Sequence, residues 1–484
     1  MAQVDPHPAY KAIPSALAPD STYMTQAGWD TLFALIDGAL PAIQTSSQNQ
    51  DTKAGLVVSE KEFEKVLDRS AEILQDGPSR EALSEYLKNR PVDDEEFQDD
   101  CRRTLGVAPQ RFEMAKVMNF VSKRTGSLLL TGHWNPPAQQ PVHVREAIIK
   151  SWYASKLTPL RMMAKSITIM AQKANATSSP YLNRMTQYTD IPRGWEPQTG
   201  YDFKFVQLEP GITTHEITTD VVIVGSGCGG AVSAKNLAEA GHKVLLVEKG
   251  YHFQPTSFPM NQNAAIKHLY DNNGMFLSDT SSTNILAGST WGGGGTINWS
   301  VSLKLQDYVR EEWAAAGLPL FTSPEYDECI DRVWKAVGAS QDAIRHNHGN
   351  RVVLEGSQKL GWRSKAIDQN TSSKEHYCGQ CHLGCGMNEK RGPTLAWLPE
   401  AAEAGAEFME GLEVHKVLFD TDGKTAIGVE GTWTARDAEG NVSTDEKNLQ
   451  KRKVIIKAKK VIVSSGTIQS PVLLARSGVK VSYH

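Results

Sequence analysis

The feature that most constrains the fold of this chain is the segment from Asp220 to Glu248. It begins with DVVIV, a short apolar run rich in β-branched residues that is typical of a strand buried in a parallel sheet. The turn GSGCGG follows, then a stretch with helical spacing (residues 231–240) and a second apolar run (residues 243–247) that ends at Glu248. Strand, glycine turn, helix, strand and acid in this order make up the dinucleotide-binding pattern, so we expect an α/β domain.

The glycines of this turn each have a physical task. Gly225 permits the tight turn, Gly227 lets the backbone approach a pyrophosphate, and Gly230 lets the helix pack closely on the strand. The helix N-terminus presents unpaired N–H groups to phosphates, and Glu248 is placed to bind ribose hydroxyls. Cys228 can be read as a redox thiol, but a small side chain under the cofactor is the favoured interpretation. The predicted contacts of the dinucleotide are Gly225, Ser226, Gly227, Cys228, Gly229, Gly230 and Glu248.

Two further segments favour FAD over NAD. Residues 288–298 read GSTWGGGGTIN, and four consecutive glycines cost so much entropy that a bulky ligand is expected beside their bare backbone. Residues 460–479 read KVIVSSGTIQSPVLLARSGV: an apolar strand, a glycine turn and a helix that we expect to open at Ser470-Pro471. This strand is predicted to return to the same sheet beside the first.

Together the three segments resemble the glucose-methanol-choline (GMC) oxidoreductase family over residues 219–479. Within that family the chain is similar to the long-chain fatty-alcohol oxidases, because of its long helical extension and the segment CGQCHLGC (residues 378–385), which is followed by Lys390-Arg391 and TLAWL. The resemblance implies FAD, and contacts to it from Gly293, Gly294, Asn298 and Val414. Val414 is included because EVHKVLFD looks like the strand whose backbone meets the adenine ring.

The same resemblance implies oxidation of long-chain primary alcohols to aldehydes, with oxygen as acceptor and hydrogen peroxide as product. It also implies an intracellular, membrane-associated location, at the endoplasmic reticulum or peroxisome. Two alternatives stay open: an FAD-dependent dehydrogenase of the same fold that uses another electron acceptor, and a flavin-binding fragment without turnover.

In the family, the catalytic histidine and much of the substrate domain follow the second signature, so the chain is expected to be truncated and catalytically inactive as an oxidase. We assign no catalytic residue and do not give a catalytic role to His242, His252 or His268.

Cys378, Cys381 and Cys385 admit three interpretations. They can form a tight turn near the flavin, they can hold a metal or an iron–sulfur cluster with His376 or His382, or they can attach a c-type haem through CxxCH. The turn is favoured, and we predict no bound metal.

The rest of the chain is predicted to be organised around this α/β domain. A basic amphipathic stretch, residues 145–172, is read as a core-facing helix, with a helix lying on a membrane as the alternative. Prolines and glycines make continued helix unexpected in residues 175–197. With 51 basic and 55 acidic residues, the chain offers no basic surface for nucleic acid, so a small-molecule substrate is the expected partner. The predicted regions are a helical one (1–214), a first FAD-binding part (215–300), an incomplete substrate or cap region (301–410) and returning FAD-binding strands (411–484).

Overall fold

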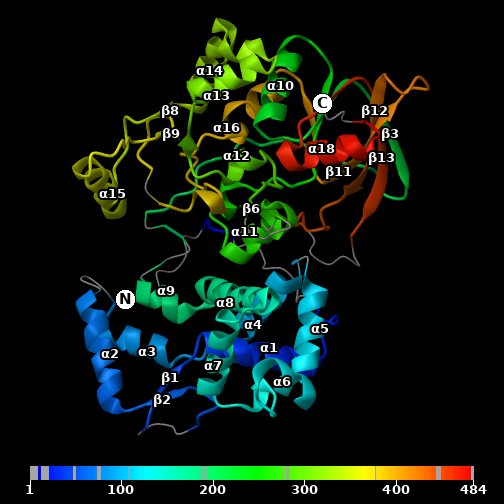
Figure 1. Cartoon of the computed structure of the whole chain (residues 1–484). Helices are drawn as coiled ribbons and strands as arrows, with labels where there is room; N and C mark the ends of the chain where they lie inside the picture. Colours follow the sequence, from blue (N-terminus) through cyan, green and yellow to red (C-terminus); the bar gives the residue numbers. More distant parts are fainter. Residues whose placement is uncertain are drawn as a thin grey trace. The chain divides into compact units, whose positions relative to one another are not determined.

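The structure of the chain, a computed structural model, divides into two compact units (Figure 1). One unit comprises residues 16–189, and the other comprises residues 1–15 and 190–484. Each has a hydrophobic core of its own. The structure describes residues 9–11, 21–46, 51–73, 78–106, 108, 110–186, 188, 191–192, 194–274, 276–278, 283–376, 378–442 and 449–480.

The first unit is built mainly from helices around α1, which packs on α5, α7 and α8. Its core includes Leu32, Met118 and Trp152, each at most 1% exposed. The unit also contains a short parallel pair, β1 and β2, that the helical pattern did not predict. Its elements are α1 (Gln26–Ala39), β1 (Ile43–Thr45), β2 (Leu56–Val58), α2 (Glu60–Ile73), α3 (Arg80–Lys88), η1 (Pro91–Asp93), α4 (Glu95–Gly106), α5 (Arg111–Val121), α6 (Arg124–Thr131), η2 (Pro137–Gln139), α7 (Val142–Tyr153), α8 (Thr158–Ser178) and α9 (Pro180–Thr186).

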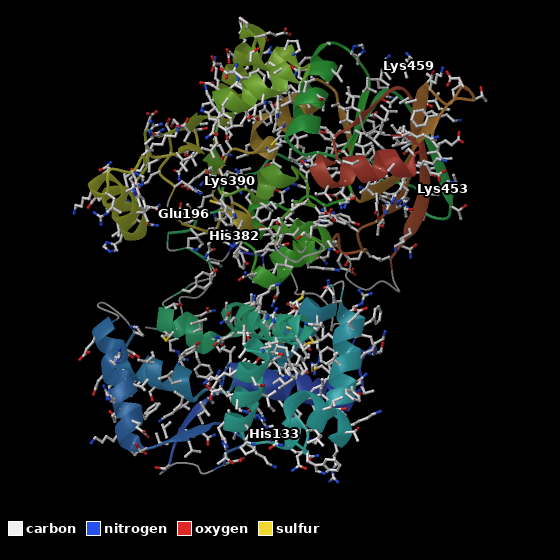
Figure 2. The ribbon with its side chains drawn as sticks, viewed as in Figure 1. His133, Glu196, His382, Lys390, Lys453 and Lys459 are labelled. Atoms are coloured by element: carbon white, nitrogen blue, oxygen red, sulfur yellow. The ribbon has the colours of Figure 1, made fainter. Side chains whose placement is uncertain are left out.

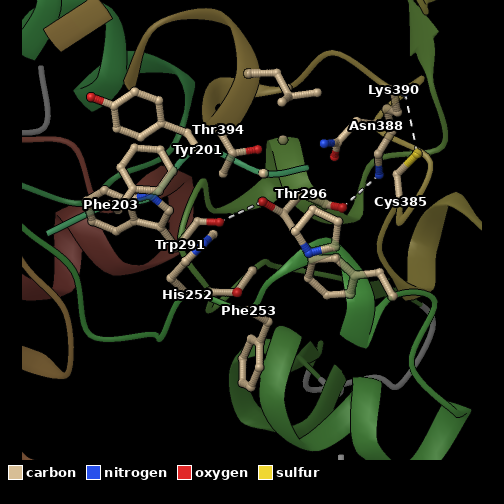
Figure 3. A pocket seen from close by; sticks show the side chains of 17 residues that line it. Tyr201, Phe203, His252, Phe253, Trp291, Thr296, Cys385, Asn388, Lys390 and Thr394 are labelled. Atoms are coloured by element: carbon tan, nitrogen blue, oxygen red, sulfur yellow. Dashed lines mark hydrogen bonds between the residues drawn. The ribbon is translucent and has the colours of Figure 1, made fainter. Parts of the chain in front are cut away.

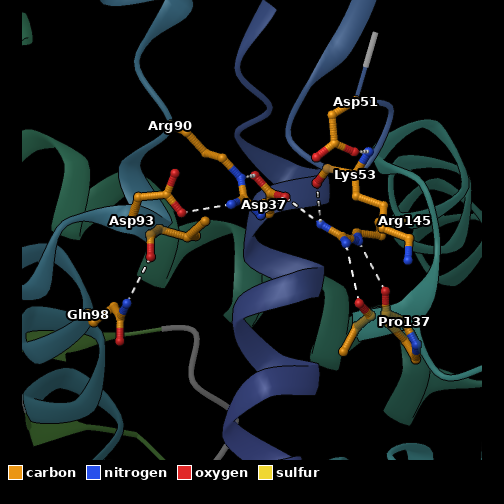
Figure 4. A network of polar contacts seen from close by, with 10 residues as sticks. Asp37, Asp51, Lys53, Arg90, Asp93, Gln98, Pro137 and Arg145 are labelled. Atoms are coloured by element: carbon orange, nitrogen blue, oxygen red, sulfur yellow. Dashed lines mark hydrogen bonds and ion pairs between the residues drawn. The ribbon is translucent and has the colours of Figure 1, made fainter. Parts of the chain in front are cut away.

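A buried ion network crosses this unit (Figure 4). The carboxylate of Asp37 on α1 is fully buried and accepts hydrogen bonds from Arg90, at 2.9 and 3.1 Å, and from Arg145, at 2.5 Å. Arg145 also donates to the carbonyl oxygen of Pro137 at 3.0 Å. The network therefore joins three segments through ion pairs in which Asp37 and Arg145 are buried.

The stretch 145–172 is not one helix but parts of two, α7 and α8, because the chain leaves the helical conformation at residues 154–157. Trp152 is buried and Leu160 and Met163 pack on the core, as the core-facing interpretation predicts. Leu157, Met162 and Ile169 are exposed, and membrane contact stays a prediction. Among the described residues, no helix is both long and apolar enough to span a bilayer.

The prediction that helix would not continue in residues 175–197 is wrong for its first part. Helix α8 runs on to Ser178 and α9 begins at Pro180. A proline is tolerated in the first turn of a helix, where its missing N–H would be unpaired in any case. Pro180 therefore starts a helix here instead of ending one.

The second unit is an α/β structure around a six-stranded sheet with the strand order β10-β4-β3-β13-β12-β11. The first four strands are parallel, and β12 and β11 are antiparallel to their neighbours. Strand β13 pairs with β3 along ten residue pairs, from Lys453–Thr214 to Val463–Val224, which confirms the predicted return to the first strand.

The elements of this unit are β3 (Thr214–Val224), α10 (Cys228–Glu239), β4 (Val244–Val247), η3 (Pro255–Ser257), α11 (Gln262–Leu269), η4 (Asp271–Gly274), β5 (Phe276–Leu277), β6 (Asn284–Ile285), α12 (Gly294–Ile297), β7 (Val301–Ser302), α13 (Asp307–Ala315), η5 (Pro319–Thr322), α14 (Pro324–Val337), β8 (Ala339–Ser340), α15 (His348–Lys359), β9 (Asp368–Asn370), η6 (Cys381–Leu383), α16 (Pro393–Ala396), α17 (Leu398–Glu403), β10 (Glu407–Met409), β11 (Leu412–Phe419), β12 (Ala426–Thr434), β13 (Lys451–Val463) and α18 (Gly466–Arg476).

The last four residues of β3, Val221–Val224, are apolar without alternation because both faces of the strand are covered there. Val221 and Ile223 belong to the core beneath α10 and α17, whereas Val222 and Val224 belong to the core shared with β12, β13 and α18. A strand covered on both faces needs apolar residues at every position. This arrangement brings the carboxyl ends of β3, β4 and β13 to one edge of the sheet.

Two features differ from the sequence-based expectations. Helix α18 begins at Gly466, so Pro471 lies inside it rather than at its start. The glycine is the reason, because Gly466 has φ +80° and lets the chain turn directly from β13 into the helix. The main segment of the second compact unit begins at residue 190, although β3 starts only at Thr214. The residues before β3 belong to this unit because Phe203 packs in the sheet core. In addition, the N–H of Val206 donates to the carbonyl oxygen of Phe408. The predicted domain bounds themselves stay predictions.

Candidate functional site

Three glycine-rich segments that lie far apart in the sequence meet at the carboxyl ends of β3 and β13. The N–H of Gly292 donates to the hydroxyl of Ser226 at 2.9 Å. A Cβ atom placed on Gly225, which has φ +106°, would lie 2.3 Å from the carbonyl oxygen of Ser464. The structure therefore brings together the turn 225–230, the segment 288–298 and the start of the last signature, as the sequence predicts for one ligand site.

The glycines of the turn separate into two kinds. A Cβ on Gly230 would lie 1.9 Å from the carbonyl oxygen of Gly225, so this glycine is required by the close packing of helix and turn. A Cβ on Gly227 would meet no heavy atom within 4 Å. Gly227 is the N-cap of α10 and gives it no side-chain cap, so the first N–H groups of the helix have no such partner. This open, positively polarised helix end fits a pyrophosphate.

Glu248 lies at the end of β4, is 7% exposed and turns its carboxylate toward the glycine turn. Its Oε2 accepts from the N–H and the hydroxyl of Ser226, at 2.9 and 2.8 Å, and its Oε1 accepts from the N–H of Gly250 at 2.9 Å. A carboxylate has about four lone-pair directions, so one remains for a ligand. Glu248 thus fixes the shape of the turn, and its contact with a ribose stays a prediction.

The residues carried over from the family resemblance fall into two groups. Gly293 lies against the glycine turn, since its Cβ would be 3.0 Å from the Gly227 Cα, and a Cβ on Gly294 would meet open space. Asn298 is half-buried, and its Oδ1 has no hydrogen-bond partner among the described residues. Val414 lies on β11, two residues after Leu412, whose N–H donates to the Glu248 carbonyl oxygen at 2.9 Å. Gly293 thus lies against the glycine turn and Val414 lies on the strand that bonds to Glu248, while the contacts of all four residues with FAD stay predictions.

A cavity with about 540 Å³ of empty space, partly open to solvent, borders these segments (Figure 3). Tyr201, Phe203 and Trp291 form an aromatic side of it, and Thr296, Cys385 and Lys390 lie at the other. Within the described residues, the indole N–H of Trp291 and the Nε2 of His252 are buried without a hydrogen-bond partner. Buried polar atoms without partners are costly, so each of these two atoms lacks a hydrogen bond that the described residues do not supply.

The three histidines near the site differ in their surroundings. His252 lines the cavity, and burial, together with the nearby charge of Arg436, lowers its pKa to about 4. A histidine with this pKa is neutral at pH 7 and is a weak general base. His268 is buried and packs edge-on against Phe253, and His242 is exposed in the turn after α10. None of the three has the environment of a catalytic base.

The cysteine segment forms a turn around η6, and polar side-chain contacts hold it. The Cys381 sulfur lies 2.6 Å from the Nε2 of His376, and the Nδ1 of that ring lies 3.0 Å from a carboxylate oxygen of Glu389. Among the described residues, no three His, Cys, Asp or Glu side chains are arranged to hold a metal ion. The segment thus folds as a turn, and the prediction that Cys378, Cys381 and Cys385 bind no metal stays a prediction.

Lys390 ties this turn to the glycine-rich segment. Its side chain is 4% exposed, and its ammonium group donates to three carbonyl oxygens, those of Thr296, Asn298 and Cys381, at 2.7, 2.8 and 2.7 Å. Burial lowers the pKa of Lys390 to about 8, against the opposing charges of the nearby thiols. All three of its N–H donors are satisfied, so the charge is held by backbone dipoles.

Sequence reasoning missed several residues of the site. Tyr201 and Phe203 follow the proline-rich stretch, where no strand or helix period points to a role, although the density of aromatic residues is a signal. Lys390 was noticed only as part of the family motif, and the pairing of His376 with Glu389 left no trace in the spacing. These side chains meet only in three dimensions.

Residues 266–483 match the family model described as GMC oxidoreductase, and residues 220–258 match the model described as FAD binding domain. A long-chain-alcohol oxidase of Arabidopsis thaliana is 30% identical over 442 residues, which cover 79% of this chain and 57% of that protein. A second Arabidopsis long-chain-alcohol oxidase is 34% identical over 269 residues, covering 55% and 35%. An uncharacterized GMC-type oxidoreductase of Mycobacterium tuberculosis is 28% identical over 322 residues, covering 65% and 47%. The chain thus spans between about a third and somewhat more than half of the length of these relatives.

Among solved structures, a formate oxidase of Aspergillus oryzae is 15% identical, covers 55% of this chain and 48% of that chain, and has a TM-score of 0.36, which is too low to support a conclusion about the fold. The residues that match the two family models include the glycine turn 225–230, the paired ends of strands β3 and β13 and the last signature. They decide between the two dinucleotides in favour of FAD. Residues 266–483 therefore belong to the GMC oxidoreductase family, and residues 220–258 before them match an FAD binding domain.

Proposed function

We propose that the chain serves the FAD-dependent oxidation of long-chain primary alcohols to aldehydes, with oxygen as electron acceptor and hydrogen peroxide as product. The observation that carries the proposal is the convergence of three glycine-rich segments around the open space at Gly227. The similarity to two plant long-chain-alcohol oxidases supports the substrate class. Because the chain spans only part of each relative, the activity is proposed for the protein to which these residues contribute.

The residues of the chain would hold FAD in three places. The N–H groups at the start of α10 would bind the pyrophosphate, Glu248 would bind the ribose, and the glycine run from Gly292 would bring bare backbone against the cofactor. When bound, FAD supplies the redox chemistry by accepting the hydride equivalent of the alcohol.

The cavity would also hold a ligand and shield part of it from water. Phe203 and Trp291 contribute aromatic surface, with ring centroids 5.5 Å apart, and an apolar wall of this kind favours an alkyl chain over a sugar. Neutral His252 and the indole N–H of Trp291 can each make one hydrogen bond to a polar group of a bound molecule. No residue described here has the geometry of a base for the alcohol proton.

The experiment is a single-turnover assay with the purified, FAD-loaded chain under anaerobic conditions. Dodecanol is compared with glucose and choline, and bleaching of the flavin absorbance is followed. Single turnover matters because absence of a positioned base slows the reaction by about 100- to 10,000-fold and would hide multiple turnovers. We expect slow bleaching by dodecanol above the rate in buffer, and none by glucose or choline.

The electron acceptor is tested in the same sample after bleaching. Readmitted oxygen should restore the flavin absorbance and yield one hydrogen peroxide per flavin. Recovery only with an added quinone would replace the oxidase by the dehydrogenase alternative. Flavin that is retained but not bleached faster by dodecanol than by buffer would contradict alcohol oxidation by these residues and leave a flavin-binding fragment.

A further inference from the structure

The cysteine turn contains three side chains in a line of polar contacts. The Cys381 sulfur lies 2.6 Å from the Nε2 of His376, and the Nδ1 lies 3.0 Å from Glu389. The imidazole is 4% exposed and the Glu389 side chain 19%. Thiol, imidazole and carboxylate in this order form the arrangement in which an imidazole activates a nucleophile and a third group orients the imidazole.

The protonation of His376 follows from its neighbours. Burial acts to lower its pKa, but the contacts with Cys381 and Glu389 outweigh burial and raise the pKa to about 10. Both ring nitrogens of an imidazolium are donors, so one N–H donates to Glu389 and the other to the sulfur of Cys381. A cysteine sulfur that accepts a hydrogen bond from a cationic neighbour is a better nucleophile toward an oxidant than a sulfur without such a partner.

Access to Cys381 is narrow. The residue is 7% exposed, whereas Cys101 in the other unit is completely buried and burial raises the pKa of its thiol. The backbone around Cys381 is held in place, since its carbonyl oxygen accepts from buried Lys390 at 2.7 Å. Because Cys381 is only 7% exposed, a reagent as small as hydrogen peroxide is expected to reach its sulfur more readily than a bulky electrophile.

We propose that Cys381, held by His376 and Glu389, is a site of oxidation by hydrogen peroxide. The sulfur attacks one peroxide oxygen, a sulfur–oxygen bond forms as the oxygen–oxygen bond breaks, and the leaving hydroxide takes the Nε2 proton of His376 to become water. The cysteine loses two electrons and becomes a sulfenic acid, while the peroxide is reduced to sulfenic oxygen and water. Hydrogen peroxide is also the product of the proposed oxidase, but reagent added from outside tests this site whether or not that activity exists.

The experiment treats the folded, purified chain with increasing hydrogen peroxide, removes the peroxide with catalase, unfolds the chain in dimedone so that the probe reaches every sulfenic acid, and maps the adducts by peptide mass spectrometry. We expect Cys381 to be labelled first and Cys101 not to be labelled. The rate at Cys381 should exceed that of a free-cysteine peptide at pH 7 and should rise less between pH 7 and pH 9, because the imidazole of His376 supports the reacting sulfur. A free-cysteine peptide in the same tube should speed up about 20-fold, because an unperturbed thiol with a pKa of about 8.5 ionises over that range.

Two variants separate this chemistry from a merely structural role. His376→Gln should slow oxidation of Cys381 by up to about 30-fold at pH 7 and make its rate rise with pH, because an ordinary thiol is only about 3% thiolate there. Glu389→Gln keeps the imidazole and should give a smaller loss, which covers the case in which His376→Gln does not fold. Labelling of Cys381 no faster than the free-cysteine peptide in the wild-type chain, with the same rise with pH, would overturn the proposal.

Discussion

The ammonium nitrogen of Lys390 lies 2.7 Å from the carbonyl oxygen of Thr296, and this buried contact joins the cysteine turn to the glycine-rich segment. Lys390 is labelled near the centre of the second unit in Figure 2. Because the same nitrogen also binds the carbonyl oxygens of Asn298 and Cys381, one side chain joins the two segments on one side of the cavity. Lysine side chains normally face water, but Lys390 is buried and helps to hold the shape of the candidate site.

Lys390→Met is expected to weaken FAD binding and to destabilise the second unit. The substitution leaves three buried carbonyl oxygens without donors, at about 1–3 kcal/mol for each unsatisfied group. Thermal melting and titration of the flavin fluorescence measure the two effects. The control is Lys459→Met, whose ammonium group pairs with Asp220 on the surface at 2.7 Å, and exposed pairs contribute about 0–1 kcal/mol. Equal FAD affinities and melting temperatures for the two variants would show that Lys390 does not hold the site.

The stability contributed by His376 should depend on pH in a definite direction. Its pKa is raised from 6.5 to about 10 in the folded chain, so the folded state holds the proton more tightly. The contribution is fully present below pH 6.5 and is lost as the pH rises to about 10. The difference in melting temperature between the wild-type chain and His376→Gln should therefore shrink from pH 6 to pH 10. A difference that stays constant over this range would mean that His376 carries no proton linked to folding.

Asp37→Asn should loosen the first unit without changing the second. The substitution leaves the buried guanidinium of Arg145 without its countercharge, and breaking a buried pair in this way costs about 3–5 kcal/mol. Hydrogen exchange should accelerate by about 150- to 5,000-fold in α1 and α7 and stay unchanged in α10. Asp30→Asn, an exposed position on the same helix, is the matched control and should leave the exchange of α1 unchanged.

The sheet and the glycine turn could be predicted because their signals are local. DVVIV requires cover on both faces, and the structure supplies it, with Val221 on one core and Val222 on the other. The meeting of the three glycine segments was predicted from the family resemblance, and Gly225 and Ser464 show the reason in the close approach of their backbones.

The remaining features depend on contacts that no local pattern records. The burial of Lys390 requires three carbonyl oxygens from two distant segments, and the pairing of His376 with Cys381 requires the turn to close first. The start of α18 was misplaced because Pro471 is a strong helix-start signal, whereas the positive φ of Gly466 decides where the chain turns. Glu248 was expected to bind a ribose, and its three hydrogen bonds to the turn were not predicted; the ribose contact stays a prediction.

The central claim, that the open space at Gly227 is the pyrophosphate site of FAD, is tested most directly by titrating FAD into Gly227→Val and Gly230→Ala chains and following flavin fluorescence. A Cβ at Gly227 meets no protein atom, so Gly227→Val should keep the melting temperature of the FAD-free chain and lose FAD binding. Gly230→Ala places a Cβ 1.9 Å from the Gly225 carbonyl oxygen, so it should lower that melting temperature as well. FAD bound by Gly227→Val with the affinity of the wild-type chain would contradict the claim.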